Sequence, residues 1–174
     1  KTWENALPIG NGRLGAMVYG NVEKETLQLN EHTLWTGGPN RNDNRLALDS
    51  LPIIRQLIFE GNQKKAQEIA NRVIITKKSH GQMFQPVGSL HLSFDGHEQY
   101  TNYYRDLDIE NAITKTSYSA GGVSYIRETF ASFPDRVIVM RLTTDRPGTI
   151  SFTASFMTSQ ARAVVNTTAA KELT

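Results

Sequence analysis

The sequence predicts a mainly β protein, an antiparallel two-sheet sandwich with a short helical hairpin inserted into it. Short segments rich in alternating or continuous apolar residues recur along the chain, and Gly, Pro, Asn and Asp turn signals separate them. Residues 50–75 show helical spacing of their apolar residues instead. The 174 residues are enough for one domain with its own core. We therefore predict a single β-sandwich domain over residues 1–174.

The first predicted strand pair lies near the N-terminus. It comprises RLGAMVYG (residues 13–20) and ETLQLNE (residues 25–31), with a turn around Gly20-Asn21. Leu27 and Leu29 alternate with polar residues, which is typical of a strand with one buried face.

Two short helices are predicted between residues 50 and 75. In the first, Ser50 is the expected N-cap, Pro52 fits the first turn, and Gly61 fits the end. Its apolar residues recur at helical spacing: Leu51, Ile54, Leu57 and Ile58. Asn62 is the expected cap of the second helix. Its apolar stripe comprises Ala66, Ile69, Ala70 and Val73.

The C-terminal half predicts further strands. Gly121-Gly122 supplies the two positive-φ positions of a tight hairpin turn within residues 113–132. Residues 87–94 form a strand that ends at Asp95-Gly96. Residues 136–142 are almost continuously apolar, which indicates a central or doubly buried strand. Residues 149–156 alternate strictly, which indicates a half-buried strand.

Composition excludes several classes of function. The formal net charge is +2, and the Lys77-Lys78 pair is too small for a polybasic patch, so no nucleic-acid partner is expected. The chain has no cysteine, which removes disulfides and thiolate chemistry. No apolar run approaches the roughly 20 residues of a membrane-spanning helix.

The glycine-rich segment PIGNGRLG raises the question of a nucleotide site. Residues 10–15 match the letters of a dinucleotide fingerprint. The next residues, 16–20, predict a strand, whereas a pyrophosphate site needs the N-terminus of a helix. A tight turn into a strand is the better interpretation.

The segment LNEHTLWTGG carries the candidate site residues Asn30, Glu31 and Trp35. Sugar sites combine an aromatic face with side chains that hydrogen-bond to hydroxyl groups. These residues are therefore candidates for the rim of a substrate site or for an interdomain contact. The alternative is structural: Trp35 lies in the core, and Glu31 caps a turn or pairs with Arg13 or Arg41.

Metal and acid–base chemistry have weak support. The four histidines, His32, His80, His91 and His97, lack the spacing of a zinc site, so no metal and no cofactor are expected. Asp106, Asp108 and Glu110 would share one face of a strand, where they suit solvent better than a catalytic pair. No G-x-S-x-G nucleophile motif is present. No residue of this chain is therefore predicted to be catalytic.

Several motifs, in fixed order, resemble the N-terminal domain of family 95 glycoside hydrolases, which are α-L-fucosidases. They cover Trp3 to about Phe156. In order they are ALPIGNGRLGAMVYG, LQLNEHTLWTGGP, QPVGSLHLSF, YYRDLDIENAITKTSY and RETFASFPDRVIVMRL. The resemblance implies a large two-sheet supersandwich packed against a separate (α/α)6 barrel.

The resemblance also implies an activity, the inverting hydrolysis of terminal α-linked L-fucose. A glutamic acid would protonate the leaving oxygen, and a water held by asparagines and an aspartate would attack. Those groups belong to the barrel, which this chain does not contain. The implied partners are a fucosylated glycan and the missing barrel, and the implied location is extracytoplasmic. A stand-alone carbohydrate-binding module and a purely structural module are the alternatives.

Overall fold

The computed structural model describes residues 2–38, 43–75 and 82–166. The chain divides into two compact units, which are described separately. The β unit comprises Lys1–Leu34 and Gln85–Thr174, and the helical unit comprises Trp35–Phe84. In the part of the chain that the structure describes, no helix is long and apolar enough to cross a membrane.

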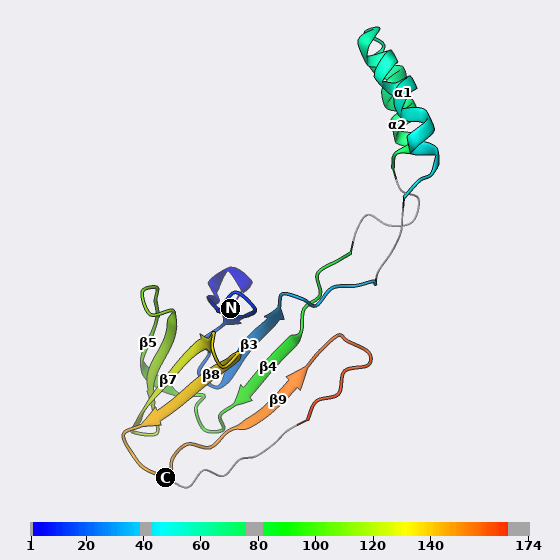
Figure 1. The fold of residues 1–174 in the computed structure, drawn as a ribbon. Helices are drawn as coiled ribbons and strands as arrows, with labels where there is room; N and C mark the ends of the chain where they lie inside the picture. The colour runs from blue at the N-terminus through cyan, green and yellow to red at the C-terminus, as the bar shows by residue number, and fades with distance from the viewer. Residues whose placement is uncertain (1, 39–42, 76–81, 167–174) are drawn as a thin grey trace. The chain divides into compact units, whose positions relative to one another are not determined.

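The first sheet of the β unit has five strands, all antiparallel to their neighbours, in the spatial order β1-β2-β3-β4-β9 (Figure 1). Its strands are β1 (Leu7–Gly10), β2 (Leu14–Val18), β3 (Lys24–Glu31), β4 (Gly88–Ser93) and β9 (Thr153–Met157). A single 3-10 turn, η1 (Trp3–Asn5), precedes β1. The predicted pairing of the two N-terminal strands is confirmed, because β2 pairs with β3.

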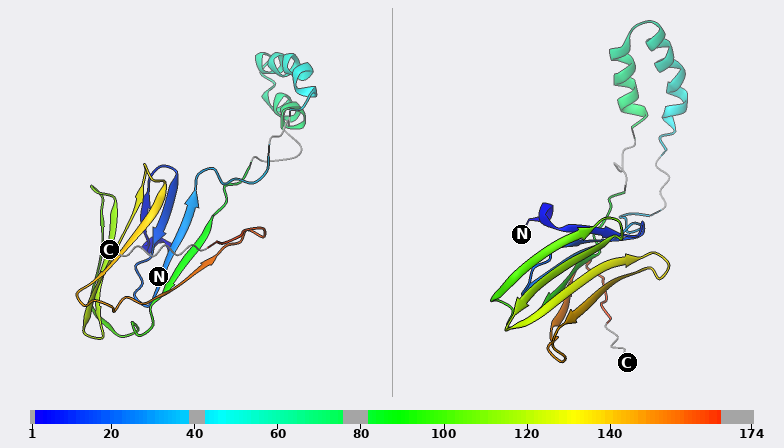
Figure 2. Two further views of the ribbon diagram at one scale, coloured as in Figure 1. Left: turned by 60° about the horizontal axis from the view of Figure 1, so that its bottom comes forward. Right: turned by 90° about the vertical axis from the view of Figure 1, so that its left-hand side faces the viewer.

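The second sheet has four antiparallel strands in the order β5-β6-β7-β8. Its strands are β5 (Tyr100–Asp108), β6 (Ile113–Ala120), β7 (Val123–Ser132) and β8 (Val137–Thr144). The hairpin turn predicted at Gly121-Gly122 joins β6 and β7, and these glycines have φ of +57° and +74°. The two sheets form the two layers of the predicted sandwich (Figure 2).

The apolar part of the core lies between the two sheets. Alternate residues of the first sheet are buried, among them Ile9, Ala16, Val18 and Leu27. Residues of the second sheet, Leu107, Ile138 and Met140, pack against this cluster. The period of two thus sends Leu27 inward and the neighbouring Thr26 and Gln28 outward.

A buried polar network ties the layers together at the other end of the core. Arg127 on β7 is 3% exposed, lies 3.7 Å from the Glu25 carboxylate on β3, and donates to the carbonyls of Asn21 and Val22. Its guanidinium also stacks on Phe94, 3.8 Å from the ring centroid. Since buried charges are costly without partners, this network fixes how the two sheets meet at this end.

Two strand predictions need correction. Residues 136–142 were expected to form a central or doubly buried strand, but β8 is the last strand of its sheet and pairs only with β7 among the described strands. Residues 149–156 were expected to form one strand, but β9 begins only at Thr153, and Ile150 and Phe152 are partly exposed. Thr149 instead bonds back to the Arg146 carbonyl and the Thr144 hydroxyl in the preceding turn.

The helical unit contains the predicted hairpin of α1 (Leu46–Phe59) and α2 (Gln63–Val73), which are antiparallel in Figure 2. Its small core contains Ile54, Ala66 and Val73. The predicted start of the first helix was wrong. Helix α1 begins four residues before Ser50, so Pro52 lies inside it rather than in its first turn. The N-cap position is Arg45, whose side chain makes no capping hydrogen bond, and the side chain of the preceding Asn44 accepts the Leu46 N–H at 3.1 Å.

Candidate functional site

The three predicted site residues are divided between the two units: two are in the β unit and one is in the helical unit. Asn30 and Glu31 are neighbours at the end of β3, so their side chains leave opposite faces of the first sheet. Trp35 belongs to the helical unit, where it pairs with Phe84 and its ring lies edge-on at 5.3 Å between centroids. Trp35 is 50% exposed, so it is not a core residue.

Glu31 is engaged by its neighbours. Its carboxylate accepts the Thr33 hydroxyl and, at 2.9 Å, the Thr33 N–H, and it pairs with Arg13 at 3.0 Å. The Thr33 hydroxyl, followed by the Thr33 N–H and the charge of Arg13, lowers the pKa of Glu31. A general acid for glycoside cleavage needs a raised pKa, so Glu31 is unsuited to that role.

Asn30 borders an open hollow on the outward side of the first sheet, which we call the outer hollow. Its volume is about 560 Å³. It is lined by Trp3, Met17, Gln28, Leu29, Asn30, Pro86, Gly88, Ser89, Met157, Thr158 and Ser159. This volume is within the usual range of small-molecule sites.

Strand register explains how the outer hollow forms. Met17 on β2 faces Gln28 on β3, and Ser89 on β4 faces Met157 on β9. These residues lie at positions that alternate with the core residues, so their side chains point away from the second sheet. The rim therefore crosses four strands that are remote in sequence.

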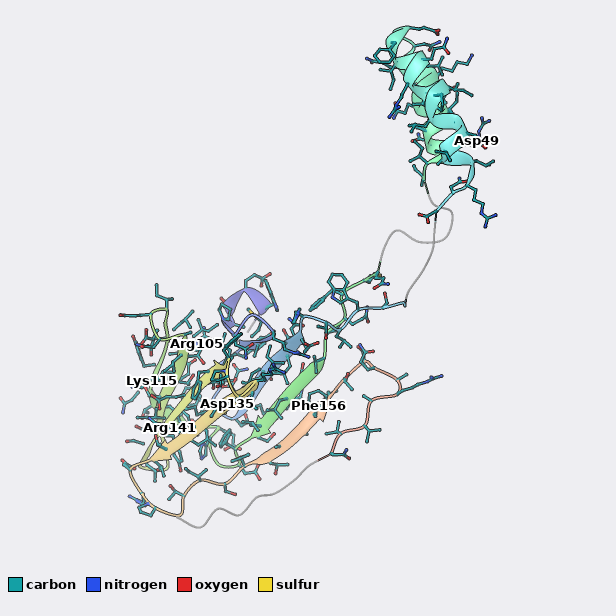
Figure 3. The ribbon with its side chains drawn as sticks, viewed as in Figure 1. Asp49, Arg105, Lys115, Asp135, Arg141 and Phe156 are labelled. Atoms are coloured by element: carbon teal, nitrogen blue, oxygen red, sulfur yellow. The ribbon has the colours of Figure 1, made fainter. Side chains whose placement is uncertain are left out.

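Gly88 shapes the floor of the outer hollow. Its φ is +146°, and a Cβ there would lie 2.4 Å from the Met157 carbonyl and 2.8 Å from the ring of Phe156. Figure 3 labels Phe156 on β9. Only glycine lets β4 and β9 approach this closely in that conformation.

The described residues that line the outer hollow carry no charge. It offers the amides of Gln28 and Asn30, several hydroxyls, two methionines and an indole. The indole of Trp3 is 59% exposed. No hydrogen bond from a described residue engages the side chains of Trp3, Gln28 or Asn30. The outer hollow can therefore bind a neutral polar molecule but offers no carboxylate for acid–base chemistry.

The other acidic residues considered from the sequence do not form a cleft pair. Asp106 and Asp108 lie on β5, whereas Glu110 follows it in the turn. The Asn111 side chain, then the backbone N–H groups of Asn111 and Glu110, lower the pKa of Asp108. Asp108 therefore stabilises the turn from β5 to β6.

The histidines lie apart. His91 on β4 contacts the Thr26 hydroxyl at 3.1 Å, and His97 is a core residue. His32 lies 3.6 Å from Glu31 at the surface. Among the residues that the structure describes, no three His, Asp or Glu side chains gather where they could share a metal ion. His80, Arg41 and the Lys77-Lys78 pair lie outside the described residues.

The glycine-rich segment forms the predicted turn. Residues 10–15 join the antiparallel strands β1 and β2, with no helix after them. The Asn11 side chain accepts the N–H groups of Arg13 and Leu14 and donates to the Ser132 carbonyl. The Asn11 side chain thus occupies the N–H groups of the turn, and a strand follows it. The segment therefore lacks the helix N-terminus that would bind a phosphate.

Sequence reasoning missed most of the outer hollow. The outward residues Gln28 and Asn30 could have been found from the alternation around Leu27 and Leu29. Trp3 and Met157 could not, because only the folded first sheet brings η1 and β9 to the hollow that Gln28 and Asn30 border.

Comparisons with known proteins find similarity to glycoside hydrolases. The sequence profile of the glycosyl hydrolase family 65 N-terminal domain matches residues 1–174. Alpha-L-fucosidase 2 of Arabidopsis thaliana is 43% identical over 159 residues, which are 90% of this chain and 18% of that protein. Probable alpha-fucosidase A of Aspergillus niger is 32% identical over 147 residues, 80% of this chain and 18% of that protein.

A third relative is also named as a probable α-fucosidase. Probable alpha-fucosidase A of Aspergillus oryzae is 30% identical over 148 residues, 81% of this chain. The chain spans only about a fifth of the length of these relatives. Since the family profile covers the whole sequence, the chain belongs to the family of glycosyl hydrolase family 65 N-terminal domains.

Proposed function

We propose that this chain is the non-catalytic N-terminal domain of a family 95 α-L-fucosidase, an exo-acting enzyme that releases terminal α-L-fucose from glycans with inversion. The observation that carries this proposal is the match to three α-fucosidases over at least 80% of the chain and about a fifth of their length. We place the enzyme outside the cytoplasm, as the resemblance to family 95 implies.

The structure supports the non-catalytic part of the proposal. An inverting glycosidase needs two carboxyl groups about 6.5–9.5 Å apart across the scissile bond, one of them with a raised pKa. Glu31 has a lowered pKa, and the outer hollow is lined by no carboxylate of the described chain. Burial raises the pKa of Glu25, but this residue is 1% exposed and lies between the sheets, where no substrate reaches it.

The test is the reaction of the longer protein that the gene encodes. We expect it to release fucose from 2′-fucosyllactose, and proton NMR should detect β-L-fucose as the first product, since inversion changes the anomer. Release of α-L-fucose first would contradict inversion. No release of fucose or of the related sugar L-galactose would contradict the substrate class. Fractionation of the source cells tests the location.

A purely structural role is compatible with the same proposal. Helix α1 exposes large apolar side chains, with Leu48 at 77% and Phe59 at 89%. Such side chains favour contact with another protein surface. In this role the domain would stabilise the catalytic barrel without contacting the sugar.

A further inference from the structure

The outer hollow has features that neither the catalytic chemistry nor the core explains. It combines an exposed indole, two amides without partners among the described residues, and a lining without charge. We propose that the outer hollow is a binding site for a neutral oligosaccharide. This proposal depends on the proposed function only for the expectation that the oligosaccharide is the enzyme's glycan substrate or a part of it.

Trp3 supplies the apolar surface of this site. Pyranose rings present patches of C–H groups, which pack on aromatic faces, and the indole N–H can donate to a hydroxyl. The 3-10 turn holds the Trp3 backbone in place, because the Ala6 N–H donates to the Trp3 carbonyl at 3.0 Å. The side chain is thus tethered beside the sheet while its ring stays accessible.

Gln28 and Asn30 supply the polar contacts. They are two residues apart on the outward face of β3, so their Cα atoms lie about 6.5–7 Å apart. Each amide both donates and accepts, as each sugar hydroxyl does. Covering these amides with an apolar segment would leave them without hydrogen bonds, which is unfavourable. The lining therefore fits a hydroxyl-rich ligand better than an apolar protein surface.

The lack of charge among the described lining residues limits the class of ligand. None of the eleven lining residues ionises at neutral pH, so the outer hollow gives a carboxylate or phosphate no counter-charge. Removing an anionic group from water there would cost free energy that no ion pair would offset. A neutral oligosaccharide should therefore bind more tightly than its sialylated counterpart.

A fluorescence titration tests the proposal. The chain has two tryptophans, so Trp35→Phe leaves Trp3 as the sole indole reporter. We expect 2′-fucosyllactose and lactose to change Trp3 emission with millimolar dissociation constants, and 3′-sialyllactose to bind at least several-fold more weakly. The same titration should be run on the longer protein.

Variants locate the binding. Trp3→Ala, followed by NMR or calorimetry, should weaken binding at least about tenfold, and Gln28→Ala or Asn30→Ala about three- to tenfold each. Gln99→Ala is the matched control, because Gln99 is exposed and outside the outer hollow. It should leave the dissociation constant unchanged. Circular dichroism confirms that each variant is folded.

The outcomes separate the two proposals. No binding by folded protein at tens of millimolar sugar, or equal binding by Trp3→Ala, would overturn the proposed oligosaccharide site even if the longer protein releases fucose. Binding lost in the Trp3, Gln28 and Asn30 variants would support the site even if no fucose is released. Equal affinity for neutral and sialylated sugars would contradict the assigned ligand class.

Discussion

At the residue scale, the surroundings of Tyr118 and His97 favour a neutral imidazole. Arg127 can only donate, and its Nη2 donates to the Tyr118 hydroxyl at 2.6 Å. Burial raises the pKa of Tyr118, which keeps its proton in place. That proton can be donated to His97 Nδ1, 2.9 Å away, when the imidazole carries its own proton on Nε2. The nearby charge of Arg127 also favours the neutral form of His97.

This arrangement makes stability depend on pH. Burial, followed by the charge of Arg127, lowers the pKa of His97 below its usual value of about 6.5. The unfolded chain therefore binds the proton more readily than the folded chain does. The unfolding free energy should fall as the pH drops below about 6.5, and this contribution should vanish above it.

Urea unfolding at several pH values tests that dependence. His97→Asn keeps an acceptor near Tyr118 but cannot titrate, so its stability should lose this part of the pH dependence. His91→Asn, which leaves His97 in place, should retain it. An unchanged pH profile in His97→Asn would contradict the assignment.

The buried ion pair should matter far more than an exposed one. Arg127→Met removes the cation beside Glu25 and the bonds to two carbonyls, and should cost about 3–5 kcal/mol of unfolding free energy. Arg141, labelled in Figure 3, pairs with Glu128 at the surface, so Arg141→Met should cost less than about 1 kcal/mol. Urea unfolding measures both costs, and similar values would contradict the structural role of Arg127.

At the element scale, the close approach of β4 and β9 depends on Gly88. Gly88→Ala should cost roughly 1–3 kcal/mol, because the new Cβ would overlap the Met157 carbonyl and Phe156. Gly15→Ala in β2 is the control, since a Cβ there meets only the Ile9 carbonyl, at 3.6 Å. Thermal unfolding compares them, and equal shifts in Tm would refute the role of Gly88.

The sequence predicted those elements that depend on residues close together in the chain. Gly121-Gly122 defined its hairpin because the turn itself needs positive φ, and Ala66 to Val73 defined α2 through their shared face. The position of β8 at a sheet edge was not predictable, because continuous apolar residues do not report how many strands lie alongside. Only the end of β5 was considered as a strand, through Asp106 and Asp108, because its first residues, Tyr100 to Tyr104, show no regular alternation of apolar and polar residues. The outer hollow was predictable only in part for the same reason. Asn30 lies in a recognisable strand pattern, whereas nothing in the sequence around Trp3 shows that it lies beside the same sheet.

At the scale of the whole molecule, the helical unit is inserted between two neighbouring residues of the β unit. The Gln85 N–H donates to the Leu34 carbonyl at 2.9 Å, so these residues lie side by side. Replacing residues 35–84 with an Asn-Gly turn should therefore leave the sandwich folded. Circular dichroism should show loss of helix with retained strand signal and cooperative unfolding. Loss of cooperative unfolding would show that the β unit depends on the insert.

The central proposal is that this chain is part of a fucosidase whose catalytic groups lie outside it. The most direct measurement compares fucose release from 2′-fucosyllactose by the purified 174-residue chain and by the longer protein at equal concentration. The account predicts release by the longer protein and none above the buffer blank for the chain alone, in agreement with the uncharged outer hollow and the lowered pKa of Glu31. Sustained release by the 174-residue chain, abolished by a substitution at one of its own carboxylates, would contradict it.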